Sequence, residues 1–332
     1  MEIKKEWREK GYADEPVEGI GDLRTAIKEL AREKNAVILG HYYTGREIQE
    51  VADFIGDSLQ LAEEAAKTGA AVIVMCGVHF MAETCKILCP EKKVLCPDIG
   101  ASCSLAESCP AEEFEKFVKA HEGYTVISYV NTSAKVKALT DVVVTSANAR
   151  QIVESFPKDE KIVFGPDRNL GAYINQRTGR RMVLWEGACH VHERFSVEGL
   201  LRLKEEHKGA KVLAHPECKA PVLKLADVVG STAKLLAFSR ESEAQEFIVA
   251  TESGILTEME KKSPEKRFYP VPPEAGESGE VGCGCNECAF MKLNTLPKLY
   301  NCLRYEWPEV DVEEEVRVRA LKPIMRMLEL SK

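Results

Sequence analysis

The sequence predicts an α/β protein built from three similar three-layer αβα domains with parallel sheets. Two observations indicate this fold: short β-branched runs alternate with helical stretches along most of the chain, and one strand pattern occurs three times. The runs are continuously apolar rather than alternating, which favours strands that helices cover on both faces. Ligands of parallel sheets bind beyond the carboxyl ends of the strands, so three such sheets can share one pocket.

The repeated pattern is an apolar strand that ends in polar or proton-handling residues. Its three copies are residues 37–43 (VILGHYY), 126–131 (VISYVN) and 212–217 (VLAHPE), and they start 89 and 86 residues apart. Second strands are expected at 72–77, 142–148 and 228–232. Third strands are expected at 94–97, at one or both of 162–165 and 182–185, and at 247–252.

The repeats divide the chain into expected domains at residues 1–109, 110–192 and 193–281. The segment 282–332 is expected to pack back on the body, with a helical stripe that breaks around Pro323. Residues 274–284 are rich in Gly and Glu and predict a loop, and residues 261–267 predict a solvated turn.

Helix starts follow several strands and carry hydroxyl side chains. A capping box is expected from Thr44 and Glu47, and helices are expected at 59–67 behind Ser58, at 147–155 behind Ser146, and at 233–238 behind Thr232. Hydroxyls and free amides at a helix N-terminus suit carboxylate or phosphate groups. Taken singly, each of these residues is also explained as a good N-cap.

Charge and hydropathy exclude two classes of partner. The chain of 332 residues has a formal net charge of −8, so it lacks the broad basic surface that non-specific nucleic-acid binding needs. No stretch approaches the roughly 18 apolar residues of a membrane helix. The N-terminus has no apolar core or cleavage site of a signal peptide, and we expect a cytoplasmic protein.

The chain contains twelve cysteines, an unusually high number. Those in three regions of the sequence suggest a metal centre. Cys103 and Cys189 lie in Gly-Ala loops just past strands of the first two repeats, and Cys283, Cys285 and Cys288 follow the strands of the third. Three converging thiolates do not match structural zinc, which is almost always four-coordinate. They suit an iron–sulfur cluster that leaves one iron open as a Lewis acid.

The remaining cysteines have a simpler interpretation. Free cysteine is among the most buried residues, so core packing is favoured over a ligand set for Cys76, Cys85, Cys89, Cys96, Cys109 and Cys302. The role of Cys218, beside the third polar strand end, stays open. His192 follows Cys189 by three residues and is interpreted as a metal ligand, a substrate contact or a donor to a ligand.

A set of short segments, in order from about residue 35 to the C-terminus, matches one known family. They are HYY at 41–43, GDS at 56–58, YVN at 129–131, TSAN at 145–148, GPDRN at 165–169, WEGAC at 185–189, HPE at 215–217, GST at 230–232 and CAFMKLN at 288–294. On these segments the chain resembles the quinolinate synthase A family, iron–sulfur enzymes of de novo NAD biosynthesis. One departure is Ala289, where the family often has proline.

The resemblance implies a fold, a cofactor and a reaction. The family has three α/β domains around a pseudo-threefold axis, with the active site at their junction. Cys103, Cys189 and Cys288 would hold one [4Fe-4S] cluster per chain. The reaction condenses iminosuccinate (iminoaspartate) with dihydroxyacetone phosphate to quinolinate, with loss of phosphate and water. An aspartate-oxidising enzyme would supply the imine through transient contact.

The resemblance also implies roles for individual residues. The positions that match the family's substrate contacts are His41, Ser58, Tyr129, Asn131, Ser146, His192, His215, Glu217 and Thr232. Glu217 is the candidate general base, with His41, His215 and Tyr43 as proton donors. Cys285 and Cys288 are close enough in sequence to pair when oxidised.

Three other functions stay open on the residues alone. A hydro-lyase with a three-cysteine cluster would share the open iron but need no second substrate. An iron–sulfur sensor or electron carrier would need no acid–base residues at the strand ends. A structural-zinc protein is the third alternative.

Overall fold

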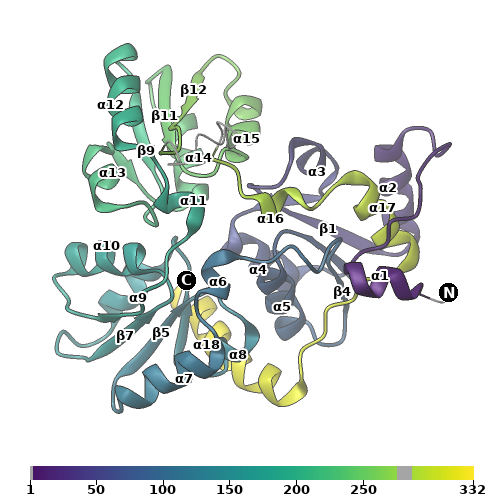
Figure 1. The fold of residues 1–332 in the computed structure, drawn as a ribbon, viewed down its shortest axis with the longest axis horizontal. Helices are drawn as coiled ribbons and strands as arrows, with labels where there is room; N and C mark the ends of the chain where they lie inside the picture. Colours follow the sequence, from purple (N-terminus) through teal and green to yellow (C-terminus); the bar gives the residue numbers. More distant parts are fainter. Residues whose placement is uncertain (1–2, 275–285) are drawn as a thin grey trace.

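Three separate four-stranded sheets form the framework of the molecule (Figure 1). The structure is a computed structural model that describes residues 3–274 and 286–332. Every strand pair within the sheets is parallel. The strand orders are β2-β1-β3-β4, β6-β5-β7-β8 and β10-β9-β11-β12, so the same order occurs three times. This confirms the predicted α/β fold with parallel sheets, and the pseudo-threefold axis stays a prediction.

The strands follow the repeat spacing of the sequence, since the first strands of the three sheets again start 89 and 86 residues apart. The first sheet contains β1 (Ala36–His41), β2 (Phe54–Gly56), β3 (Val72–Cys76) and β4 (Lys93–Leu95). The second contains β5 (Thr125–Tyr129), β6 (Val142–Val144), β7 (Ile162–Gly165) and β8 (Val183–Leu184). The third contains β9 (Lys211–Ala214), β10 (Val228–Val229), β11 (Glu246–Ala250) and β12 (Arg267–Pro270).

Helices connect the strands within each unit. Around the first sheet lie α1 (Lys5–Lys10), α2 (Leu23–Glu33), α3 (Arg46–Val51), α4 (Ser58–Lys67), α5 (His79–Leu88) and α6 (Ser104–Glu107). The second has α7 (Ala111–Ala120), α8 (Ala134–Lys137), α9 (Ala149–Ser155), α10 (Arg168–Thr178) and α11 (His190–Glu193). The third has α12 (Val197–Glu206), α13 (Ala220–Leu225), α14 (Thr232–Glu241) and α15 (Ile255–Lys262), and the chain ends with α16 (Ala289–Lys292), α17 (Leu296–Tyr305) and α18 (Glu314–Leu330).

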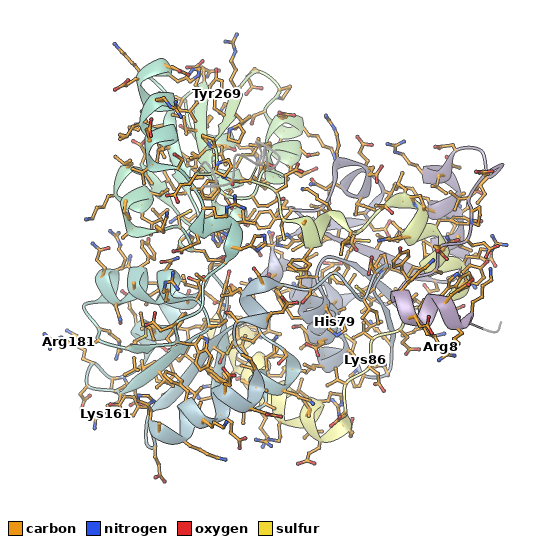
Figure 2. The ribbon with its side chains drawn as sticks, in the orientation of Figure 1. Arg8, His79, Lys86, Lys161, Arg181 and Tyr269 are labelled. Carbon is orange, nitrogen blue, oxygen red and sulfur yellow. The ribbon has the colours of Figure 1, made fainter. Side chains whose placement is uncertain are left out.

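Each sheet is buried on both faces, which is why its strands are continuously apolar. In β3, Ile73 belongs to one hydrophobic core and its neighbour Val74 to another, because successive side chains point to opposite faces. The same alternation separates Val163 from Phe164 in β7 and Ile248 from Val249 in β11. Charged side chains such as Arg8, Lys161 and Arg181 extend from the outside of the molecule (Figure 2).

The sequence does not predict two of the strands, β2 and β12. Because β2 is present, each later strand of the first sheet comes one place later in the order than expected. β2 has only three residues, too few to stand out between two helices, so β3 is the third strand of its sheet and not the second. The strand expected at 94–97 is therefore the fourth, β4. β12 begins at Arg267 inside the stretch expected as a turn, and both candidate runs at 162–165 and 182–185 are strands.

The two C-terminal helices α17 and α18 lie against the first and second units. α17 packs on α2, with Leu299 and Leu303 in the core behind the first sheet. α18, yellow in Figure 1, lies along β6 and α8 of the second unit. The expected break at Pro323 is wrong, because the helix runs on through this residue. Burial of Ile324 and Met327 on the same face of the helix offsets the free-energy cost of the backbone hydrogen bond that proline removes.

No helix among residues 3–274 and 286–332 has the length and apolar character required to cross a membrane.

Candidate active site

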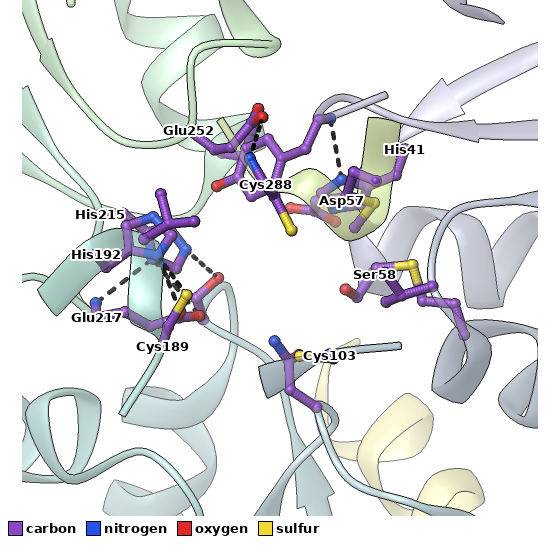
Figure 3. A pocket seen from close by; sticks show the side chains of 18 of the residues that line it. His41, Asp57, Ser58, Cys103, Cys189, His192, His215, Glu217, Glu252 and Cys288 are labelled. Atoms are coloured by element: carbon purple, nitrogen blue, oxygen red, sulfur yellow. Dashed lines mark hydrogen bonds and ion pairs between the residues drawn. The ribbon is translucent and has the colours of Figure 1, made fainter. Parts of the chain in front are cut away.

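One cavity lies where the carboxyl ends of the first strands of the three sheets converge (Figure 3). Its empty space is about 690 Å³, a figure that includes the open solvent at its mouth. The residues to which the family resemblance gave roles in the site line it: His41, Tyr43, Ser58, Cys103, Tyr129, Asn131, Ser146, Cys189, His192, His215, Glu217, Thr232 and Cys288. The structure thus brings them together, while the role of each stays a prediction.

Two residues near the cavity were missed by the sequence analysis. Glu252 lines the cavity and is fully buried, and Thr251 lies directly behind it. Both follow β11, so a polar pair directly after a buried strand was the signal that could have found them. The rest of the wall comes from five apolar residues and four polar ones: Val78, Phe80, Met81, Val191 and Met291, and Asp57, Ser104, Thr145 and His190.

His41 and His215 have the same local geometry at the ends of β1 and β9. The backbone N–H of Tyr43 donates to His41 Nδ1 at 3.1 Å, and the backbone N–H of Glu217 donates to His215 Nδ1 at 3.4 Å. A neutral ring that accepts at Nδ1 carries its proton on Nε2. Burial lowers the pKa of each histidine to about 3, so both rings are neutral at pH 7.

Glu217 is the central charge of the cavity. Tyr129 Oη donates to its Oε1 at 2.5 Å, and His192 Nδ1 lies 3.1 Å from its Oε2. Burial alone would raise the pKa of Glu217, but His192, His215 and the Tyr129 hydroxyl lower it to about 2. The carboxylate is therefore ionised at neutral pH, and it is buried at 3% exposure.

A chain of hydrogen bonds connects Glu217 to Tyr43 across the three units. His192 Nε2 lies 3.0 Å from Thr251 Oγ1, and Thr251 Oγ1 lies 2.7 Å from Tyr43 Oη. Tyr43 Oη in turn lies 2.8 Å from Thr232 Oγ1. Burial raises the pKa of the Tyr43 phenol well above its usual value, so this hydroxyl keeps its proton at neutral pH. Thr251 is thus the link between two residues of the cavity wall.

Helix starts place two of the predicted hydroxyls at the cavity. Asp57 caps α4 by accepting the N–H groups of Leu59 and Gln60, which puts Ser58 at the first helical position. Ser231 caps α14 by accepting the N–H of Lys234, which puts Thr232 at the same position.

Two of the predicted helix starts were wrong. α9 begins at Ala149, two residues later than expected, because the Asn148 side chain accepts the N–H of Thr145 and closes a turn first. The expected capping box is absent too, because Thr44 Oγ1 donates to the His41 carbonyl at 2.8 Å and α3 starts after Gly45.

Tyr129 is the last residue of β5, and Asn131 lies in the turn that follows the strand. Lys137 is fully buried, and its Nζ donates to the carbonyl oxygens of Val130, at 2.8 Å, and Thr132. Burial lowers the pKa of Lys137 to about 8. Within the described residues, the buried Oδ1 of Asn131 has no hydrogen-bond partner. A buried acceptor without a donor costs free energy, so this atom is suited to accept from a bound ligand.

The three candidate ligands occupy equivalent positions. Cys103, Cys189 and Cys288 are each the residue before a helix of four residues, α6, α11 and α16. Two of these loops are fixed by buried carboxylates: Cys189 N–H donates to Asp167 Oδ2 at 3.3 Å, and Cys288 N–H donates to Glu252 Oε1 at 2.9 Å. Burial raises the pKa of all three thiols, for Cys103 to about 12.

The other cysteines of the described residues behave as predicted. Cys76, Cys85, Cys89, Cys96, Cys109, Cys218 and Cys302 are buried in the hydrophobic cores, whereas the three candidate ligands are partly exposed. Cys218 Sγ donates to the Ala250 carbonyl at 3.3 Å, so packing accounts for the cysteine that the sequence left open. Cys283 and Cys285 lie outside the described residues.

The donor set of the cavity can hold a metal. Ligand atoms of Cys189, His192 and Glu217 all lie within 4.8 Å of one another. Thiolate sulfur is the ligand that iron–sulfur clusters use. The thiols of Cys103, Cys189 and Cys288 line this same cavity, so the chemistry of the donor set is compatible with such a cluster.

Lys292 ties the C-terminal segment to the rest of the site. Its Nζ donates to Glu252 Oε1 at 2.9 Å and to the Tyr43 carbonyl at 2.8 Å. Asn294 Nδ2 donates to the Gly77 carbonyl at 2.8 Å. These bonds fix α16, and with it Cys288, between the first and third units.

Comparisons with known proteins identify the family of the chain. The chain matches the family described as quinolinate synthetase A protein (NadA) over residues 25–329. It is 55% identical over 311 residues to the quinolinate synthase of Chloroherpeton thalassium, with 94% of this chain and 95% of the relative covered. It is 54% identical to that of Trichormus variabilis over 93% of this chain and 94% of the relative, and 53% identical to that of a Synechococcus species over 96% and 98%. The chain belongs to the quinolinate synthetase A family.

Proposed function

We propose that the protein makes quinolinate by condensing iminosuccinate with dihydroxyacetone phosphate, with loss of phosphate and water, as a transferase of the cytoplasm. The observation that carries the proposal is the single cavity in which three cysteines, two neutral histidines and a buried carboxylate converge from three sheets. An electron carrier has no use for such an acid–base set.

Three cysteines would hold one [4Fe-4S] cluster per chain: Cys103, Cys189 and Cys288. When bound, the cluster supplies a Lewis acid at the iron that no cysteine binds. The donor chemistry supports this assignment, because all three thiols line the cavity and each precedes one short helix. Metal binding would replace the thiol protons, which burial otherwise holds in place.

Substrate anions would bind at the helix starts and strand ends. Ser58 and Thr232 each open a helix of ten residues at the cavity wall, where backbone amides and a hydroxyl can donate to carboxylate or phosphate oxygens. Ser146 would add a third hydroxyl. Tyr129 and Asn131 would hold the reacting oxygen atoms, since Asn131 Oδ1, which has no hydrogen-bond partner within the described residues, can accept from a substrate hydroxyl.

Proton transfer would fall to Glu217 and its neighbours. Glu217 is ionised and would remove a proton from the carbon next to a carbonyl or imine. His41 and His215 are neutral, with the Nε2 proton as the one they can donate to a departing oxygen. Tyr43 is the third donor, and Thr251 would hold it at a fixed distance from His192.

An assay after anaerobic purification tests the proposal. The protein should form quinolinate only when iminosuccinate and dihydroxyacetone phosphate are both present. Turnover of a hydroxy acid without the phosphate ester would instead support a hydro-lyase. Absence of any product with a fully loaded enzyme would contradict the proposal.

A further inference from the structure

A second, larger cavity lies beside the candidate active site, between the second and third units. It is a groove of about 1820 Å³ including open solvent, with walls from α9 and α10 on one side and α13, β10 and α14 on the other. Four cationic residues line it: Arg150 and Arg177 from the second unit, and Lys224 and Lys234 from the third. We refer to it as the basic groove.

The cations of the basic groove are not neutralised by carboxylates on its walls. Among the described residues, Arg177, Lys224 and Lys234 form no ion pair, and Arg150 pairs with Glu154. The one carboxylate of the lining, Asp227, already accepts from Lys211 Nζ at 3.3 Å and from the Val212 N–H at 2.8 Å. In a chain with net charge −8, this is a local reversal of sign.

The groove adjoins the active-site cavity through a thin wall. Ser146 lines both cavities. Pro216 lines the groove, while its neighbours His215 and Glu217 line the site. The Ser146 hydroxyl lies 3.1 Å from His215 Nε2, so a hydrogen bond joins the second and third units at this wall.

A substrate needs a route to groups as buried as these. His215 and Glu217 are each only 3% exposed. A cleft lined by one sign of charge raises the local concentration of ions of the opposite sign and can speed their association by at least about tenfold. The wall at Ser146 and His215 is where the basic groove comes nearest to these buried groups.

We propose that the basic groove binds small dianions and delivers them to the active site past Ser146 and His215. The ligand class is a compact molecule with two negative charges, either a phosphate monoester or a dicarboxylate. The inference rests on the proposed function, because both proposed substrates are of this class. Arg177 and Lys224 are the main contributors, since both are exposed and free of ion pairs in the described chain.

Charge reversal tests the groove with a matched control. The double variant Arg177→Glu/Lys224→Glu is compared with Arg202→Glu/Lys208→Glu, which changes two exposed cations outside the groove by the same net charge. At low salt the groove variant should lose about tenfold in kcat/KM at unchanged kcat, and added salt should shrink the difference. The control should stay close to wild type. Arg177→Lys/Lys224→Arg keeps the charge and should restore kcat/KM.

Binding measured without turnover separates this proposal from the proposed function. Equilibrium dialysis of the cluster-loaded protein uses dihydroxyacetone phosphate and, separately, succinate as probes. Weaker binding of either probe in the groove variant alone supports the groove and identifies which dianion it takes, even if no quinolinate forms. If both probes bind the two double variants equally and kcat/KM is the same at low salt, the groove proposal is overturned while quinolinate synthesis can still stand.

Discussion

The cavity and the sheet cores contain the same residue type in two contrasting settings. The cavity cysteines, Cys103, Cys189 and Cys288, lie in loops just before helices of a single turn. Two of the core cysteines, Cys76 in β3 and Cys302 in α17, are at most 1% exposed. Side-chain chemistry is identical in both, so position alone separates a candidate ligand from a small hydrophobic residue.

The largest difference between cavity and core cysteines is expected when each cysteine is replaced singly by alanine. Cys103→Ala, Cys189→Ala and Cys288→Ala should each lose the broad visible absorption of the cluster and all quinolinate synthesis, because two thiolates cannot hold the cube. Cys302→Ala is the matched control and should keep both, at a cost of about 1–2 kcal/mol in unfolding free energy. Full absorption in one cavity variant would exclude that residue as an essential ligand.

The second prediction separates chemistry from cofactor binding within the cavity. Glu217→Gln should keep the visible absorption but lose about 10²–10⁴-fold in kcat, because an amide cannot take the proton. The change is nearly isosteric, so loss through misfolding is disfavoured. Glu198→Gln alters an exposed carboxylate on α12 and serves as the control. Normal turnover in Glu217→Gln would remove this residue from the mechanism.

Substitution of Thr251 tests whether this residue affects catalysis by positioning Tyr43 and His192. Thr251→Val keeps the shape but removes the hydroxyl that lies 2.7 Å from Tyr43 and 3.0 Å from His192, so kcat should fall by up to about 10²-fold with little change in KM. Thr251→Ser keeps the hydroxyl and should recover most of kcat. Equal kcat values for the two variants would show that only packing matters at this site.

The smallest expected effect is the pH dependence of stability. In the folded protein, burial lowers the pKa of His41 and His215 to about 3, below the about 6.5 of an unfolded chain. At pH values between these two pKa values, the unfolded state binds more protons than the folded state. Stability is therefore complete above about pH 6.5 and falls with decreasing pH, by up to about 1.4 kcal/mol per pH unit for each histidine.

Urea unfolding at pH 7 and pH 5 measures this slope. His41→Gln should make the slope shallower, because one of the two histidines that bind a proton on unfolding is then absent. A slope that does not change in His41→Gln would show that this imidazole is protonated in the folded state.

Much of the fold followed from the sequence because burial on both sheet faces leaves a direct mark. Strands such as β3 and β6 are continuous apolar runs, and the repeat spacing located the first strand of each sheet. β2 escaped because three residues are too few to form a recognisable run. β12 escaped because it begins with Arg267 and ends with Pro270, which are typical of a turn.

The site was predictable where a local pattern marks it and not where contacts between units create it. Strand ends such as His41 and Glu217 carry visible polar residues, and the family resemblance assigned them roles. Thr251 and Glu252 look like the end of another strand. Their importance depends on Tyr43 and Lys292, 208 and 40 residues away in the chain. Only packing of the three units brings these partners together.

Iron and acid-labile sulfide analysis of the anaerobically purified chain tests the central claim most directly, namely that the cavity cysteines hold a four-iron cluster and the core cysteines hold no metal. We predict about four irons and four sulfides per chain for the wild type and for Cys302→Ala. Each of the three cavity variants should contain almost none. A single metal ion per chain, or iron that survives the loss of the cavity cysteines, would contradict the account.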